Sequence, residues 1–430
     1  MANLIFIFIF IFIFIPLNTF GQNSKNLSAS NYQHNWTLSF LHTLSKNQAN
    51  TEGINLGNQI FSVPTNQLTN ELRPNYSLNY NNDYKLKIKP TILLNTQEIR
   101  KNSDTVAVSG SQLKADLKEM YIEYLRLKNW NIRLGLQTYQ WGPTEIYSPS
   151  NFLFHFQKES KSFSYLEKGY MLGNLIYNIN DSSNIQFLGE LYSNLESSWI
   201  NDVDFSPRSL LKFEQSFSNS FNYIGLTVGQ AERKRTAIGF YGNYVPFSGF
   251  SIYLDGRSTQ GEVGYRPNLK NDGNIDMILS NNKNNNRLFL ISGVRYESGF
   301  DMRIEAIYFQ EGYDSNEYNL WLSSLDFNQN NFLNNVMSSN KNGLDFLTQK
   351  YYYISLRIPE LGARHDLTLS FRSLMAVEKS SQTYAVSLDK PLNTNSNVFF
   401  EYVQNAGEKN SEFLLSDKLR VSLGLKIIYF

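Results

Sequence analysis

The chain has 430 residues, a formal net charge of +1 and no cysteine. Charged residues make up 18% of it, below the roughly 25% of average globular chains. The near-neutral charge gives no nucleic-acid footprint, and the lack of cysteine excludes disulfides, thiolate metal sites and a lipidated N-terminal cysteine. A mean hydropathy of −0.37 excludes a bundle of membrane helices, and the 31 phenylalanines and 27 tyrosines exclude a disordered chain.

The first segment predicts a secretory signal peptide. Residues 4–16 read LIFIFIFIFIFIP, an uncharged apolar run shorter than the roughly 20 residues that a membrane-spanning helix needs. Thr19 and Gly21 are small residues placed for cleavage before Gln22. We therefore assign 1–21 to the signal peptide and expect 22–35 to be a short periplasmic lead-in, with the folded domain over 36–430.

The rest of the chain alternates between apolar and polar residues with a period of two. Residues 84–89 read YKLKIK, and 300–308, 366–372 and 420–429 show the same alternation. Successive side chains of a strand point to opposite faces, whereas a helix would need a period of 3.6. The pattern predicts an all-β protein.

The expected connections alternate between short and long. Outer-membrane barrels have short periplasmic turns and longer extracellular loops, and this alternation fits them if the C-terminus is periplasmic. Counting back from Phe430 predicts a closed antiparallel transmembrane barrel of about 18 strands, with 16 as the alternative and the first strand near Trp36–Leu44. The short connections are expected near 81–83, 129–131, 180–183, 218–220, 246–249, 297–299, 359–363 and 391–396. The longer ones are expected near 96–115, 138–166, 194–207, 258–286, 311–349 and 404–416, with brief outer connections near 231–235 and 375–380.

A soluble sandwich or propeller would also explain the alternation. It would not explain the signal peptide, the low charge or the aromatic excess. Aromatic girdles at the two membrane interfaces do explain the phenylalanine and tyrosine content. The composition therefore favours a barrel in a membrane over a soluble β-protein.

The last stretch, LRVSLGLKIIYF, resembles the C-terminal signal of Gram-negative outer-membrane barrels, a closing amphipathic strand that ends on phenylalanine. Here the apolar phase runs through Tyr429, so Phe430 is out of phase with the family pattern. The resemblance implies a location in the outer membrane of a Gram-negative bacterium. It also implies outer-membrane lipid and the barrel-assembly machinery as partners, the latter through this strand.

A second stretch, IRLGLQTYQWGPTEIYSPSNFLF at 132–154, resembles a segment of large bacterial barrels, among them alginate-export-type porins and capsule-assembly barrels. The usual second basic residue before the glutamine is Leu136 here. The resemblance implies about 18 strands, in agreement with the count of connections. The matching positions are Arg133, Gly135, Gln137, Trp141, Gly142, Pro149 and Asn151.

This segment has two interpretations from its residues alone. Trp141 follows a strand end near Thr138, and its ring could stack on a sugar while the amides of Gln137 and Asn151 bond hydroxyl groups. These three residues are therefore possible glycan contacts. Alternatively, Trp141 is a girdle residue and the following Gly-Pro is only a turn.

The phase of each strand predicts which side chains line the lumen, since those opposite the apolar row should face water. A cationic ring would lower the barrier for anions, whereas charges paired across strands would merely line the wall. Because their strands are far apart in the sequence, we expect Arg133, Arg303, Arg357 and Arg372 to surround the lumen. The predicted pore-lining residues are Lys85, Lys87, Lys89, Arg133, Arg295, Arg303, Glu305, Arg357, Arg372 and Arg420. Further acidic residues in this phase are Glu190, Asp255, Asp366 and Glu401.

Two functions remain open. The first is a porin-like channel for passive passage of small polar or anionic solutes, and the alternative is a barrel that exports or attaches surface polysaccharide.

The asparagine-rich segment 327–342 could fold inward as a constriction or stay outside as a surface loop. The four histidines are scattered and no metalloprotease, nucleophile-elbow or P-loop motif is present, so we expect no enzyme, metal or cofactor. The oligomeric state stays open.

Overall fold

The computed structural model describes residues 32–58, 61–101, 108–153, 169–192, 208–217, 219–230, 235–261, 264–271, 273, 275–280, 285–326, 346–378, 380–409 and 411–429. The predicted signal peptide, residues 22–31 of the predicted lead-in and the asparagine-rich segment 327–342 lie outside these residues. The interpretations given for them stay predictions.

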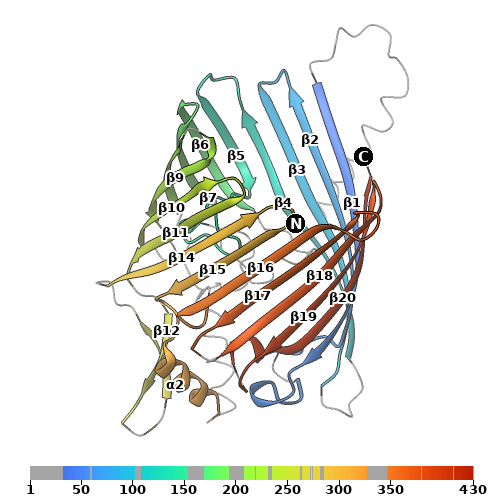
Figure 1. Ribbon diagram of the computed structural model, residues 1–430, viewed down its shortest axis with the longest axis vertical. Coiled ribbons are helices and arrows are strands. Elements are labelled where there is room, and N and C mark those ends of the chain that lie inside the picture. The colour runs from blue at the N-terminus through green and yellow to red at the C-terminus, as the bar shows by residue number, and fades with distance from the viewer. Residues whose placement is uncertain are drawn as a thin grey trace.

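One 18-stranded antiparallel sheet dominates the molecule (Figure 1). Its first half comprises β1 (Tyr32–Ala49), β2 (Asn66–Tyr80), β3 (Tyr84–Ile99), β4 (Val108–Tyr124), β5 (Trp130–Gln137), β6 (Tyr170–Asn180), β7 (Ser183–Tyr192), β8 (Ser209–Phe217) and β9 (Asn219–Gln230). The second half comprises β10 (Thr236–Phe247), β11 (Phe250–Gln260), β14 (Asn286–Glu297), β15 (Asp301–Phe309), β16 (Lys350–Leu361), β17 (Leu367–Ala376), β18 (Ser381–Asn393), β19 (Ser396–Ala406) and β20 (Asp417–Tyr429).

The remaining elements lie in connections between these strands. The 3-10 helices η1 (Gly53–Asn58) and η3 (Glu412–Leu414) follow β1 and β19, and the helix α2 (Ser315–Asp326) follows β15. Strands β12 (Gly264–Leu269) and β13 (Ile275–Ser280) form a separate two-stranded sheet after β11. Within the described part of the chain, no helix is both long enough and apolar enough to cross a membrane.

The sheet closes on itself through β1. This strand pairs with β2 on one side, with Trp36 opposite Tyr76, and with β20 on the other, with Leu38 opposite Tyr429. A closed sheet leaves no unpaired strand edge, and lipid tolerates no such edge. The predicted closed 18-strand barrel is confirmed, and 16 strands is wrong. Strand β1 is longer than Trp36–Leu44, so residues 32–35 of the predicted lead-in belong to it.

The connections alternate as predicted. Short turns follow β2, β4, β6, β8, β10, β14, β16 and β18, and the other connections, which include all the long ones, lie at the opposite end. In the β2–β3 turn, Asn81 and Asn82 take φ values of 53° and 58°, which asparagine tolerates better than most residues. One expected connection was too wide: β3 continues to Ile99 and β4 begins at Val108, inside the predicted 96–115 loop.

The outer surface carries an aromatic row near the short turns. The rings of Tyr32 and Tyr80 lie 4.6 Å apart, and those of Trp130 and Tyr177 also lie 4.6 Å apart. Farther along the strands, outward positions hold exposed aliphatic residues such as Leu134. An aromatic row that borders an apolar band is the surface that outer-membrane barrels present at a lipid interface.

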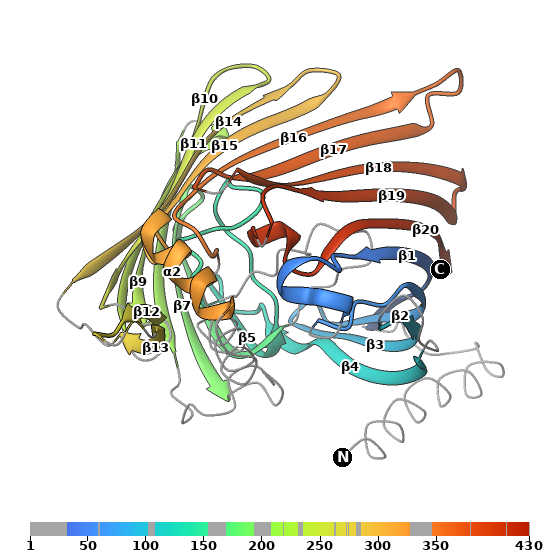
Figure 2. The same ribbon diagram turned by 90° about the horizontal axis from the view of Figure 1, so that it is seen from below.

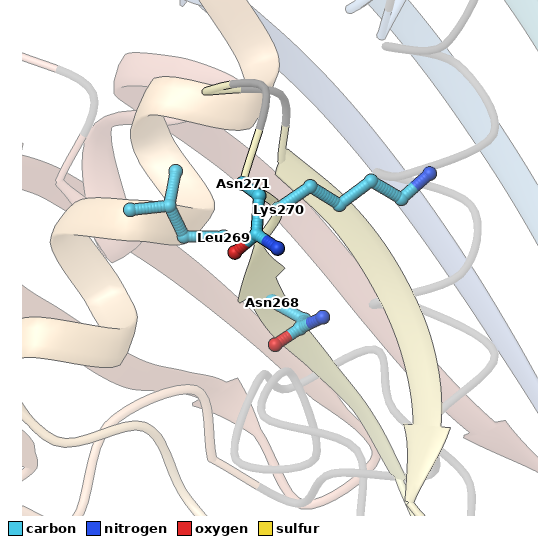
Figure 3. Close-up of a pocket in the computed structure, with 4 residues that line it drawn as sticks. All are labelled: Asn268, Leu269, Lys270 and Asn271. Carbon is cyan, nitrogen blue, oxygen red and sulfur yellow. The ribbon is translucent and has the colours of Figure 1, made fainter.

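A small unit lies beyond the barrel wall at the end with the long connections. Arg266 of β12 forms an ion pair with Glu317 of α2, with Nη1 and Oε2 2.9 Å apart, and this contact joins the hairpin to the helix. The hairpin tip carries a shallow pocket that holds no predicted site residue (Figure 3). The pocket is lined by Asn268, Leu269, Lys270 and Asn271.

Candidate pore constriction

The connection after β5 enters the barrel. Residues 138–153, here called the inward loop, contact β9, β11, β15 and β16. These strands lie several positions around the barrel from β5 and β6, so the loop reaches them across the lumen. Figure 2, which looks from the end with the long connections, shows this blue-green segment within the ring of strands. The inward loop is therefore the best-supported constriction among the described residues.

Two buried carboxylates of the inner wall hold the inward loop. Asp255 of β11 accepts hydrogen bonds from Ser148 Oγ at 2.6 Å and from the Ser150 amide at 2.8 Å. Glu305 of β15 accepts a hydrogen bond from the Glu145 amide at 2.8 Å. Both carboxylates have 0% exposure, so these bonds also satisfy polar groups that would be costly to bury alone.

The side chain of Glu145 makes contacts of its own with the wall. Its Oε2 accepts a hydrogen bond from Ser355 Oγ of β16 at 2.7 Å and lies 3.5 Å from Arg303 Nε of β15. The main chain and the carboxylate of Glu145 are thus held by different wall residues.

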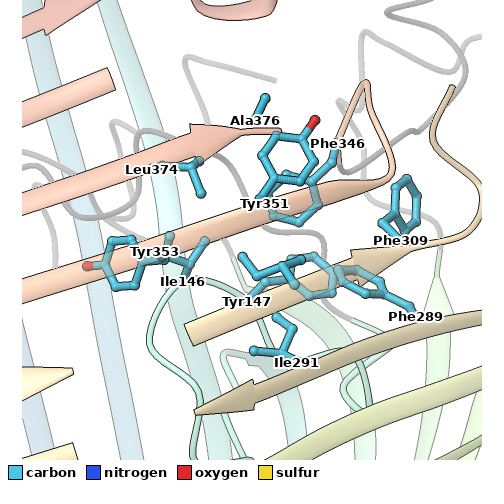
Figure 4. Close-up of a cluster of buried hydrophobic side chains, with 11 residues drawn as sticks. Ile146, Tyr147, Phe289, Ile291, Phe309, Phe346, Tyr351, Tyr353, Leu374 and Ala376 are labelled. Carbon is cyan, nitrogen blue, oxygen red and sulfur yellow. The ribbon is translucent and has the colours of Figure 1, made fainter. Parts of the chain in front are cut away.

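Apolar packing completes the attachment of the inward loop. Ile146 and Tyr147 pack in a buried cluster with inward residues of β14, β15, β16 and β17 (Figure 4). The ring of Tyr147 lies 4.8 Å from that of Phe289. Burial of each such side chain stabilises the fold by roughly 1.5–3 kcal/mol. The wall is apolar on its inward face here because the loop covers it, an exception to the polar lumen that the strand phase predicts.

The structure places the three predicted glycan contacts in buried positions. Trp141 is only 7% exposed and packs on the inner wall with Phe152 and Leu153, so its ring is neither an open sugar platform nor a lipid-facing girdle residue. Gln137 donates to the Leu172 carbonyl at 2.8 Å, and Asn151 donates to the carbonyl of Tyr139 at 2.9 Å. All three side chains are buried and fix the loop.

Four of the predicted pore arginines lie on neighbouring strands. Arg295, Arg303, Arg357 and Arg372 lie on the inward faces of the successive strands β14, β15, β16 and β17, here called the arginine row. Arg295 pairs in register with Arg303, and Ser355 lies opposite both Arg303 and Arg372. Arg133 lies apart, on β5. Arg303, Arg357 and Arg372 are neighbours because successive strands of a barrel pair with each other, whatever the length of the loop between them.

Many of the predicted pore-lining residues form ion pairs. Glu119 lies 3.2 Å from Lys87 and 2.6 Å from Lys89, and Glu123 lies 2.8 Å from Arg133. In the arginine row, Arg295 pairs with Asp301 at 2.8 Å, Arg303 lies 3.6 Å from the same carboxylate, and Arg372 pairs with Glu401 at 3.1 Å. Glu305 faces inward as predicted, but the loop covers it, so it does not line a water path.

Three predicted lining residues differ from those that form ion pairs. Lys85, Arg357 and Arg420 form no ion pair with any other residue that the structure describes. Arg357 is also exposed, on the inward face of β16 beside Asp301 of β15. It is the member of the arginine row that is most available to a passing anion. Its availability could not be predicted from sequence because it depends on which carboxylates lie within reach.

No family model and no curated protein matches this sequence. Solved structures with the same fold include Acinetobacter baumannii OccAB1, with a TM-score of 0.57 and 9% identity over 95% of this chain and 99% of that one. The structure of Pseudomonas aeruginosa OpdK with vanillate has a TM-score of 0.52 and 10% identity over 92% of this chain and 98% of that one. The structure of Pseudomonas aeruginosa OccK2 (OpdF) in complex with glucuronate has a TM-score of 0.51 and 9% identity over 93% of this chain and 99% of that one. At such identities the likeness extends to the fold alone.

Proposed function

We propose that the protein is a porin-like channel in the outer membrane of a Gram-negative bacterium, for passive passage of small polar and anionic solutes. The observation that carries the proposal is the arginine row on β14–β17, beside an inward loop that narrows the lumen. Guanidinium groups stay charged at any working pH and offer planar donors to carboxylates. A cationic wall at a constriction favours anions.

Two further observations support this proposal. The outward face combines exposed aliphatic residues with an aromatic row, as a lipid-facing barrel requires. Among the structures with the same fold, one contains vanillate and another contains glucuronate, and both solutes are carboxylates. The polysaccharide alternative is not favoured, because the residues that suggested it are buried between the inward loop and the wall.

Replacing Arg357 by glutamine tests the proposal. We expect Arg357→Gln to shift the reversal potential in a planar bilayer under a KCl gradient toward cations, because it removes an available positive charge from the lumen. The matched control is Arg364→Gln, which removes the same charge from an exposed position in the short β16–β17 turn. The control should leave the potential unchanged. An unchanged potential in Arg357→Gln, or an equal shift in both variants, would contradict the proposal.

A further inference from the structure

The inward loop places a carboxylate of the protein against two donors of the kind that would bind a solute carboxylate. Ser355 of β16 lies opposite Arg303 of β15 on the inner face. The Glu145 carboxylate accepts a hydrogen bond from Ser355 Oγ at 2.7 Å and lies 3.5 Å from Arg303 Nε. We define Arg303 and Ser355 as the Glu145 contact site.

This carboxylate can leave its partners without release of the loop. The amide of Glu145 donates to Glu305, and Ser148 and Ser150 donate to Asp255, so the main chain is held independently of the side chain. The apolar packing of Ile146 and Tyr147 adds to this attachment. Rotation of the Glu145 side chain away from Arg303 and Ser355 would leave these main-chain attachments intact.

The Glu145 contact site is also within reach of the lumen. The side chains of Arg303 and Glu145 are 19% and 20% exposed, and Ser355, which contacts Glu145, is 8% exposed, whereas the loop-holding Asp255 and Glu305 are fully buried. Breaking a largely buried ion pair is costly when one charge is left without a partner, so Glu145 can leave Arg303 only if another carboxylate takes its place. Arg357 lies nearby, opposite Asp301, and its available charge would attract an incoming anion.

We propose that Arg303 and Ser355 form a binding site for the carboxylate of a passing solute, and that Glu145 fills this site as an internal competitor when no solute is present. The inference rests on the proposed channel function. It gives Glu145 the role of setting how tightly such a carboxylate binds. Solute binding breaks the contact between Glu145 and Ser355, and solute exit restores it.

The test uses glucuronate as the probe and glucose as its neutral counterpart. Single-channel currents in KCl give the glucuronate concentration that blocks half of the current. We expect Glu145→Gln to lower this concentration about three- to tenfold, because glutamine keeps the shape but removes the competing negative charge. Adding Ser355→Ala to Glu145→Gln should reverse most of the gain. Glu145→Asp, which keeps the charge on a shorter side chain, should fall between wild type and Glu145→Gln.

Two controls separate this role from other causes. Glu360→Gln makes the same change at an exposed position near the short-turn end of β16 and should leave the block unchanged. Glucose permeation, measured by liposome swelling, should be equal in wild type and Glu145→Gln. A change in glucose permeation would mean that the loop had moved, and an unchanged glucuronate block in Glu145→Gln would mean that the carboxylate does not compete. Either result overturns the inference while an anion-selective wild type would still support the proposed function. A cation-selective wild type would contradict the proposed function itself.

Discussion

Gly142 is the residue whose backbone most constrains the inward loop. Its φ of +90° lies in the region that favours glycine, and an added Cβ would lie 2.2 Å from Asp255 Oδ2 and 2.4 Å from Ser148 Oγ. These two groups form one of the hydrogen bonds that hold the loop. A side chain at this position would therefore push the loop away from the wall.

We expect Gly142→Ala to increase single-channel conductance and to make the current noisier, because the loop loses its contact with Asp255. The left-handed backbone alone costs roughly 1–2 kcal/mol for a residue with a Cβ. Gly299→Ala is the control, since Gly299 has φ +72° but open space around the added atom. It should lower the unfolding temperature slightly and leave the conductance unchanged. Equal conductance in Gly142→Ala and wild type would show that this contact does not fix the constriction.

The side chains that face inward could largely be predicted from the sequence, and their partners could not. Alternation within a strand sets the inward position of Arg303 and Arg372, because successive side chains point to opposite faces. Which carboxylate each one meets depends on register and on the path of the loop. Glu145 illustrates this limit. It lies in the loop after β5 but reaches Arg303 of β15, and strands β6–β11 and β14 of the barrel separate the two in the sequence.

At the scale of elements, the inward loop was the main feature that sequence reasoning missed. The sequence pointed to 327–342 as a possible constriction, and that segment lies outside the described residues. The loop that enters the lumen carries apolar residues such as Ile146 and Phe152, which also suit a membrane girdle. The available signal was a pair of acidic residues, Asp255 and Glu305, at inward positions of their strands.

Strand β20 closes the barrel, and we expect its loss to prevent assembly. Deletion of residues 419–430 removes most of the pairing of β20 with both β1 and β19, which leaves two strand edges in lipid. It also removes the segment that resembles the C-terminal assembly signal. Membrane fractionation and heat-modifiable migration on gels should show no inserted protein.

The control for this deletion is the removal of residues 266–277 from the β12–β13 hairpin. That hairpin belongs to a separate two-stranded sheet, so its loss should leave the barrel able to insert. Normal insertion of the chain that lacks 419–430 would refute the role given to β20. Failure of both deletions would show that insertion depends on the outer hairpin as well.

At the scale of the whole molecule, the lumen has two kinds of wall. The inward loop covers a wall of buried apolar residues on β6, β7, β8, β10 and β14–β17, and the arginine row lies beside this covered region. The inward faces of β18, β20 and β1 carry small polar side chains instead, such as Ser387, Ser422 and Ser45. In the proposed channel, the arginine row determines which sign of solute charge is favoured.

The reversal potential of the wild-type protein in a planar bilayer tests the proposed channel most directly. Under a KCl gradient at low mean salt, we expect a preference for chloride over potassium. The preference should shrink as salt increases, because the screening length falls from about 10 Å at 0.1 M to about 3 Å at 1 M. A preference for potassium at low salt, or no conductance from folded and inserted protein, would contradict the assignment of an anion-favouring channel.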